Sequence, residues 1–151
     1  MRARVLIALF LWVAGCGGST SRGTVTVNFA QGSAFLKIRA EVATTPDARS
    51  RGLMGRRSLA ADAGMLFVFP ATVRSGFWMK DTLIPLDIAF IARGRVSEIR
   101  TMQPCRVRSC PVTTPSDPYE WALEVNAGAF ERAGISVGAV VDTDPRLAPA
   151  D

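Results

Sequence analysis

Side chains able to do chemistry are concentrated between residues 76 and 92, in the stretch GFWMKDTLIPLDIAFIA. Trp78, Lys80, Thr82 and Asp87 bring an aromatic face, an ammonium, a hydroxyl and a carboxylate close together in sequence. An aromatic plate with a few convergent polar groups is typical of a small cavity that binds a polar ligand. The alternative is structural: one aromatic side chain fills the core, and Lys80 pairs with an acid at a strand end.

A group of arginines, Arg49, Arg51, Arg56 and Arg57, surrounds the second half of a helix predicted near residues 44–54. Cations at this end complement the helix dipole. Alternatively, one guanidinium binds a ligand through its planar fork of donors, and Arg51 is the one that we include in the site. The candidate ligand-binding residues are therefore Arg51, Trp78, Lys80, Thr82 and Asp87.

The chain contains no histidine, which excludes histidine triads, histidine acid/base catalysis and histidine-ligated zinc. It has no phosphate loop or dinucleotide fingerprint, and we expect neither a metal nor a cofactor. The enzymatic alternative is an envelope hydrolase that uses Asp87 and Lys80, and only Asp81 with Asp87 is placed as a carboxylate pair for glycoside chemistry. We favour a binding protein over an enzyme and assign no catalytic residue.

The N-terminus has the pattern of an export signal. Arg2 and Arg4 precede ten apolar residues, 5–14, too few to span a bilayer. The run ends in Val-Ala-Gly-Cys16, which resembles a bacterial lipobox, so we expect residues 1–15 to be removed and Cys16 to carry lipid. An ordinary signal peptide with an incidental cysteine is the alternative. The mature protein would then face the periplasm or the cell exterior, anchored to a membrane by its acyl chains.

Cys105 and Cys110 remain as an even pair in an exported protein. Oxidising compartments favour disulfides, so we predict that the two are joined. A redox-active pair is the other possibility, but the spacing is not the close C-x-x-C of such pairs.

The formal net charge is +5 and the sequence pI is about 9.9. The basic residues are scattered and most are arginine. A scattered distribution lacks the basic stripe of a nucleic-acid-binding surface, so we expect no nucleic-acid partner.

The 151 residues, of which 48% are hydrophobic, suit one domain. Turn signals divide the chain into about eight short strands and two short helices, which predicts a mainly β fold, either a β-sandwich or a partly closed barrel. We expect a tether at 16–23, the domain at 24–144 and a tail at 145–151. The expected strands are 25–29, 35–42, 64–69, 75–80, 86–92, 96–102, 119–125 and 137–141, and the helices lie near 44–54 and 127–133.

Several short motifs resemble those of the bacterial and archaeal family called domain of unknown function 192. They are Arg51-Gly52-Leu53-Met54 with Arg56, 64–69, Phe77 to Thr82 with Ile84 to Asp87, 99–105 and 134–138. The resemblance runs from about Phe35 to Asp142, and Asp81 stands where the family motif commonly has asparagine. It implies a compact, mainly β fold, often exported or lipid-anchored, and supplies no reaction. We therefore expect an exported lipoprotein that binds a small polar ligand or a cell-envelope partner.

Overall fold

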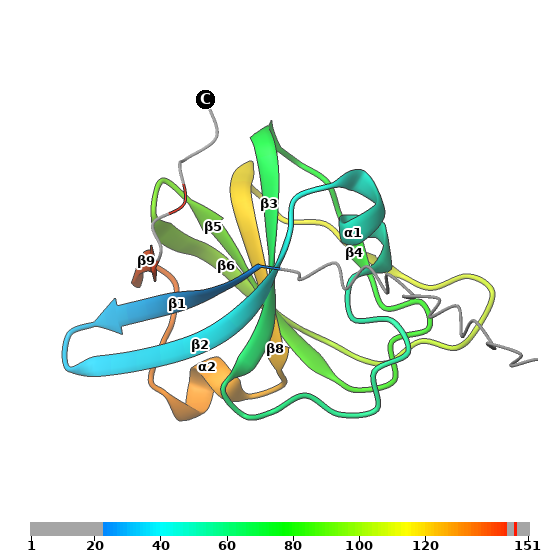
Figure 1. Cartoon of the computed structure of the whole chain (residues 1–151), viewed down its shortest axis with the longest axis horizontal. Coiled ribbons are helices and arrows are strands. Elements are labelled where there is room, and N and C mark those ends of the chain that lie inside the picture. The colour runs from blue at the N-terminus through cyan, green and yellow to red at the C-terminus, as the bar shows by residue number, and fades with distance from the viewer. Residues whose placement is uncertain (1–22, 145–146, 148–151) are drawn as a thin grey trace, which may run out of the picture.

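The computed structural model describes residues 23–144 and residue 147 (Figure 1). The predicted signal peptide, Cys16, the tether up to residue 22 and most of the predicted tail lie outside these residues. The described chain forms nine strands and two short helices. The strands are β1 (Thr24–Gln31), β2 (Ala34–Ala43), β3 (Ala63–Val73), β4 (Phe77–Trp78), β5 (Leu86–Ala92), β6 (Arg95–Met102), β7 (Val112–Thr113), β8 (Tyr119–Asn126) and β9 (Val140–Asp144), and the helices are α1 (Pro46–Arg51) and α2 (Ala129–Arg132).

Seven strands close into a barrel in the order β1-β2-β3-β8-β5-β6-β9, and β9 pairs back onto β1. Neighbouring strands are antiparallel except β2 and β3, which run parallel. β4 and β7 form a separate two-stranded sheet. The predicted mainly β class is confirmed, and of the two expected architectures the barrel is the one found. Closure removes the unpaired edges at which sheets tend to aggregate.

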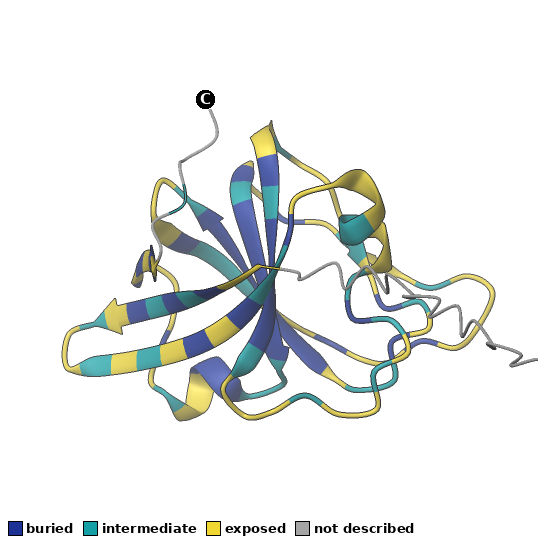
Figure 2. Ribbon diagram, viewed as in Figure 1, coloured by how far each residue is buried: buried dark blue, intermediate teal, exposed yellow. Residues whose placement is uncertain are grey.

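Burial distinguishes two kinds of barrel strand (Figure 2). β1 and β2 alternate between buried and more exposed positions, as strands with one solvent-facing side do. β3, β5 and β8 are buried on both faces for most of their length. β8 lies between β3 and β5, so these three strands carry apolar layers on both sides.

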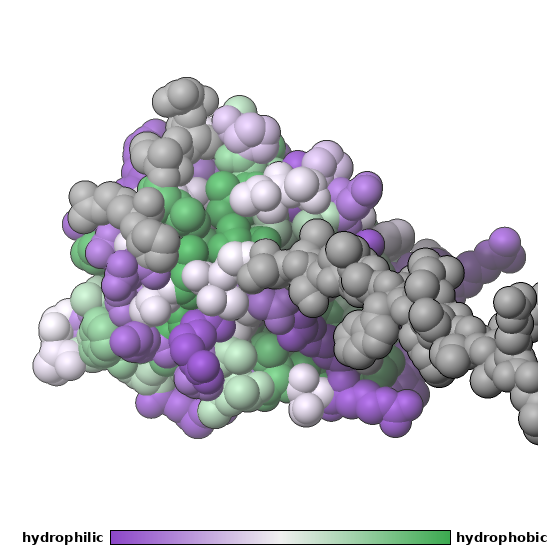
Figure 3. Space-filling model, in the orientation of Figure 1, coloured by the Kyte–Doolittle hydropathy of each residue, from purple (hydrophilic) through white to green (hydrophobic). Residues whose placement is uncertain are grey.

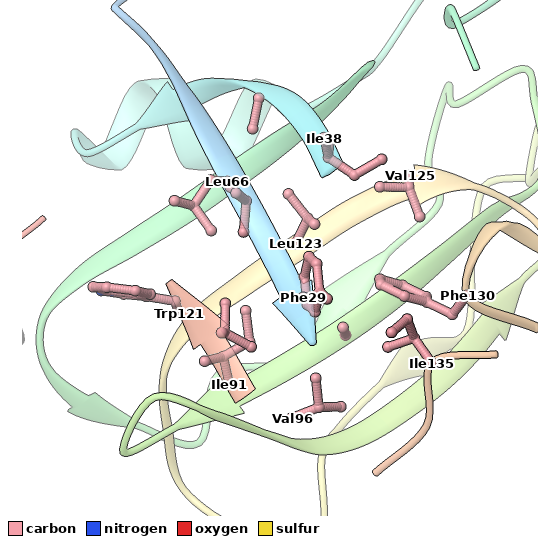
Figure 4. Close-up of a cluster of buried hydrophobic side chains, with 14 of the residues drawn as sticks. Phe29, Ile38, Leu66, Ile91, Val96, Trp121, Leu123, Val125, Phe130 and Ile135 are labelled. Atoms are coloured by element: carbon pink, nitrogen blue, oxygen red, sulfur yellow. The ribbon is translucent and has the colours of Figure 1, made fainter. Parts of the chain in front are cut away.

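The first apolar layer is the barrel interior, where side chains from all seven barrel strands and α2 converge (Figure 4). Phe29 and Phe130 meet edge to face with ring centroids 5.3 Å apart. Gly64 allows β3 to approach β8 closely, because a Cβ there would lie 2.7 Å from the Glu124 carbonyl oxygen. The interior is thus packed with side chains and is not a ligand channel.

The second layer lies on the outer face of β3, β8 and β5 and is covered by α1, the segment after it, and the β4–β7 sheet. Phe77 of β4 packs against this face, with its ring centroid 4.9 Å from that of Phe67 and 5.9 Å from that of Phe90. The ring centroid of Tyr119 lies 4.9 Å from that of Phe90. The Tyr119 hydroxyl donates a hydrogen bond to the Ser75 carbonyl at 2.6 Å. The aromatic side chains therefore fix the cover onto the barrel.

The predicted disulfide is confirmed, with Cα atoms of Cys105 and Cys110 5.9 Å apart. Its loop is joined to the chain that follows β4. The Cys105 N–H donates to the Met79 carbonyl at 3.3 Å, and the Asp81 N–H donates to the Cys105 carbonyl at 3.1 Å. The disulfide loop thus supports the stretch that contains the candidate residues.

The β5–β6 hairpin turns at Arg93 and Gly94, both with positive φ. The register shifts between Phe90 and Ile91, where Phe90 pairs with Glu98 and Ile91 with Val96. β4 is shorter than the predicted strand 75–80, and it pairs with β7 and not with β5. The positive φ of Asp81 explains why the strand does not continue toward β5.

Figure 3 shows one face of the molecule, on which hydrophilic side chains surround apolar atoms gathered near the middle. Large exposed apolar side chains include Phe35, Trp78 and Val137, and of these Trp78 is a candidate site residue. Within residues 23–144, no helix has the length and apolar character needed to cross a membrane.

Candidate functional site

Three of the five candidate residues, Arg51, Trp78 and Thr82, line one small hollow between α1, β4 and the outer face of the barrel. Figure 1 shows α1 and β4 on the same side of the barrel. The hollow has a volume of about 30 Å³, room for one group of the size of water. Phe67 and Glu124 line it from the barrel side. We call it the Glu124 hollow.

Glu124 was not among the residues selected from the sequence. Its side chain lies on the outer face of β8, and the residue is only 5% exposed. Among the described residues, its carboxyl group has no hydrogen bond or ion pair. Burial raises the pKa of this carboxyl to about 8, because removing water disfavours the charged form. A buried carboxyl that lines a hollow and has no partner among the described residues is unusual.

α1 positions Arg51 at the edge of the Glu124 hollow. The helix begins after Thr45, whose hydroxyl accepts the Ala48 N–H at 3.2 Å, with Pro46 in the first turn. The observed helix lies within the range 44–54 that the sequence predicted. Arg51 is exposed, and its guanidinium makes no hydrogen bond or ion pair with the described residues. Its guanidinium is therefore available to a ligand.

Arg49, one turn earlier, has a structural role. Its guanidinium donates to the Thr44 and Val68 carbonyls and lies 4.8 Å from the centre of the Phe69 ring. These contacts attach α1 to β3. The two explanations offered for the arginine group thus apply to different members, since Arg49 fixes the helix and Arg51 does not.

Trp78 and Lys80 form a second part of the site at the rim. Trp78 is 47% exposed, and the Lys80 Nζ lies 5.8 Å from the centre of its ring. A cation over an indole face contributes about 0.5–1 kcal/mol at an exposed position. Lys80 does not line the Glu124 hollow. Its positive charge lies next to Trp78, which does line the hollow.

Thr82 is 4% exposed, and its hydroxyl donates to the Lys80 carbonyl at 3.5 Å, a long contact. The hydroxyl retains capacity for a second partner in the hollow. The turn before it passes through Asp81, whose φ is +54°. Asparagine and aspartate tolerate this left-handed conformation better than other non-glycine residues. An asparagine at position 81 would therefore meet the same backbone requirement as Asp81 does.

Asp87 lies apart from the other candidate residues. Its carboxylate accepts the Thr101 hydroxyl at 2.7 Å and the Gly128 N–H at 2.8 Å, so each oxygen holds a partner. It borders a different, open hollow beside α2, which Lys80 does not line. Asp87 thus connects β5, β6 and the start of α2, and the geometry does not bring it together with Lys80 for hydrolysis.

An open groove of about 580 Å³ adjoins the Glu124 hollow. The two share four lining residues, Arg49, Ser50, Phe77 and Trp78. Pro46, Phe69 and Pro70 give the groove an apolar side. A molecule with one group in the hollow therefore has room for its remainder along the groove.

No group of three or more cysteine, aspartate or glutamate side chains is placed to hold a metal ion within the described part of the chain. The groups that the site offers are instead a carboxyl, a guanidinium, a hydroxyl and aromatic rings. Such groups bind by hydrogen bonding, charge and ring contact.

Comparison with known proteins shows similarity to one family. Residues 26–143 match the family model DUF192, described as Uncharacterized ACR. A Sinorhizobium meliloti 1021 protein, described as a "putative transcription regulator", has 34% identity and a TM-score of 0.76, over 84% of this chain and 98% of that chain. A protein of unknown function from Novosphingobium aromaticivorans DSM 12444 has 30% identity and a TM-score of 0.74, over 83% of this chain and 89% of that one. No match was found among curated proteins.

Proposed function

This chain belongs to the DUF192 family, and from that premise we propose that it is an exported, lipid-anchored protein that binds a small polar ligand at the Glu124 hollow. The ligand is either free or presented by a component of the cell envelope. The proposed binding residues are Glu124, Arg51 and Thr82, with Trp78 and Lys80 at the rim.

One observation carries the proposal: a carboxyl group that is almost fully buried, lines a hollow and has no partner among the described residues. A carboxyl group in this position has lost most of its hydration, which disfavours its charged form unless a partner replaces the water. A core position of this kind is ordinarily filled by an apolar side chain. A ligand that hydrogen-bonds to Glu124 would replace the lost water, which is why we assign binding to this hollow.

The proposed location rests on the N-terminal sequence, where Arg2, Arg4 and an apolar run precede the lipobox-like Cys16. The confirmed disulfide fits an oxidising compartment. The S. meliloti protein is described as a putative transcription regulator, but the described residues of this chain offer no recognition helix. Within the described residues the helices are six and four residues long, too short to lie along a DNA major groove as recognition helices do.

The proposal is tested by a thermal-shift screen of the mature domain against small polar compounds, including amino acids, sugars and envelope fragments. A ligand at 100 times its Kd stabilises the fold by about 2.7 kcal/mol, which raises Tm by several degrees in a domain of this size. We expect at least one compound to give a dose-dependent rise that Trp78→Ala and Arg51→Ala reduce.

Two control variants match these changes in type but lie toward the β1–β2 hairpin. Phe35→Ala removes another exposed aromatic side chain, and Lys37→Ala removes another exposed cation. Both should leave the shift intact. A screen without any hit, or hits that all four variants retain, would show that the Glu124 hollow is not a binding site.

A further inference from the structure

We propose that the Glu124 hollow takes the head group of a zwitterionic amino acid, with its ammonium on Glu124 and its carboxylate on Arg51. This inference rests on the proposed function and names its ligand class. The side chain of the amino acid would lie in the adjoining groove.

Size and wall chemistry favour an ammonium as the buried group. The hollow of about 30 Å³ admits a group no larger than water. A primary ammonium has this size, whereas a carboxylate, a phosphate and a sugar ring are larger. Phe67, Phe77 and Trp78 line it, and aromatic faces attract cations. The Glu124 carboxylate and Thr82 hydroxyl oxygens can accept the ammonium hydrogens.

The positive charge at the rim of the hollow disfavours binding of an amine that has no carboxylate. Arg49 and Arg51 of α1 also line the hollow, and two guanidinium groups repel a ligand that is only a cation. Arg49 already donates to two carbonyls, whereas Arg51 has no partner among the described residues. A carboxylate next to the ammonium would pair with Arg51 in a charge-assisted, bidentate contact. A zwitterion therefore satisfies both unpaired groups at once.

The adjoining groove can hold the side chain of the amino acid. It shares Phe77 and Trp78 with the hollow and continues past Pro46, Phe69 and Pro70. These surfaces suit an aliphatic or aromatic side chain, since burial of apolar area contributes about 25 cal/mol per Å². We therefore expect amino acids with apolar side chains to bind better than glycine.

Binding should also displace a proton. The charged groups lining the hollow with Glu124 are Arg49 and Arg51, and the strands paired with β8 place the apolar Met65 and Ile88 opposite it. The pKa of the free carboxyl is about 8, so at lower pH an ammonium must replace the Glu124 proton. Affinity should fall by up to about tenfold for each pH unit below that value.

The experiment uses three probes of matched shape in isothermal titration calorimetry near pH 8. L-leucine is the zwitterion, isocaproate is the same molecule without its amine, and isopentylamine is the same molecule without its carboxylate. We expect L-leucine to bind roughly tenfold or more tightly than either partial probe, because each of them loses a charge-assisted contact.

Two variants assign the contacts. Glu124→Gln should bring L-leucine down to the affinity of isocaproate, and Arg51→Ala should bring it down to that of isopentylamine. Lys37→Ala, an exposed cation toward the β1–β2 hairpin, is the control and should change nothing. Equal binding of the three probes, or L-leucine binding that Glu124→Gln leaves unchanged, overturns the assignment.

The outcomes separate this inference from the proposed function. If none of the twenty amino acids binds while another compound gives a shift that depends on Trp78, the amino-acid assignment is wrong and the binding site stands. If no compound of any class binds, both are wrong.

Discussion

Glu124 makes the stability of this protein depend on pH in an unusual direction. Most carboxylates in folded proteins stabilise the fold when they are charged, so acid weakens it. Burial raises the folded-state pKa of Glu124 from the ordinary 4.5 to about 8, so the folded state holds a proton that the unfolded chain releases. Its contribution is fully present below about pH 4.5 and is lost as pH rises through about 8.

We therefore predict that the free energy of unfolding falls between about pH 5 and pH 8 in the wild type, and that Glu124→Gln removes this fall. Each unit of pKa shift corresponds to about 1.4 kcal/mol, an upper limit because water can enter near the carboxyl. Urea denaturation at several pH values measures the effect. The variant should be less stable relative to wild type at acid pH than at alkaline pH, since glutamine has no proton to lose.

Glu131→Gln makes the same chemical change at an exposed position of α2 and should follow the wild-type curve. Parallel curves for the wild type and Glu124→Gln would mean that the Glu124 carboxyl is hydrated in solution and keeps an ordinary pKa. That result would also weaken the argument for a ligand at the hollow.

At the scale of elements, the covering of the outer face of β8 is the feature of the fold that could not be predicted from the sequence. The sequence correctly predicted a strand at 119–125, and in β8 Glu124 faces away from Trp121, Leu123 and Val125 of the barrel interior, whereas Tyr119 belongs to the outer layer. The alternation of residues 119–125 gave no sign that the outer face is covered as well. That cover comes from α1 and from the chain after β4, which are distant in sequence from β8, so local periodicity holds no information on it.

Strand parity explains the separate position of Asp87. In β5 the side chains of Leu86, Ile88 and Phe90 belong to the outer layer, whereas Ala89 belongs to the barrel interior. Asp87 has the parity of Ala89, and a shift of one residue along a strand reverses the face. The residue types in the stretch 76–92 correctly indicated polar and aromatic side chains that could bind a ligand. Whether Asp87 points to the same face as the other candidate residues depends on the residue at which β5 begins. The sequence leaves that boundary uncertain by a residue or more.

The turn that joins β4 to β5 gives a further prediction. Asp81 has a φ of +54°, and its N–H and carbonyl are bound to Cys105 and Gly55 at 3.1 and 2.9 Å. Asp81→Asn should change the free energy of unfolding by less than about 0.5 kcal/mol, because asparagine tolerates this conformation. Asp81→Val should lower it by about 1–2 kcal/mol, since the left-handed region is costly for a β-branched side chain. Chemical denaturation measures both.

Asp117→Val is the control for that pair, because Asp117 is exposed and lies outside the positive-φ positions. It should be close to neutral. If Asp81→Val unfolds at the same denaturant concentration as Asp81→Asn, the turn can relax without loss of free energy, and the asparagine of the family motif needs another explanation.

At the scale of the whole molecule, the site lies near the point where the chain enters the barrel. The Gly23 carbonyl accepts the Val42 N–H at 3.1 Å, so β1 starts beside the end of β2, which leads into α1. The β1–β2 hairpin extends away from α1 and β4 (Figure 1). Residues 16–22 can span at most about 25 Å. With lipid on Cys16, this tether would keep the domain close to the membrane, and we propose that a ligand presented by the envelope then lies within reach of the Glu124 hollow.

Lipid attachment is the premise of that arrangement, and it predicts that the full chain made in a bacterial host incorporates labelled palmitate and partitions with membranes. Cys16→Ser should abolish the label, because no other thiol occupies the lipobox position. Incorporation of labelled palmitate is a better measure of lipid attachment than membrane fractionation alone. An uncleaved signal peptide could also retain the Cys16→Ser variant at the membrane. The double change Cys105→Ser, Cys110→Ser removes the disulfide and should leave the label intact. Label that survives Cys16→Ser would contradict the anchor and, with it, the placement of the binding site beside a membrane.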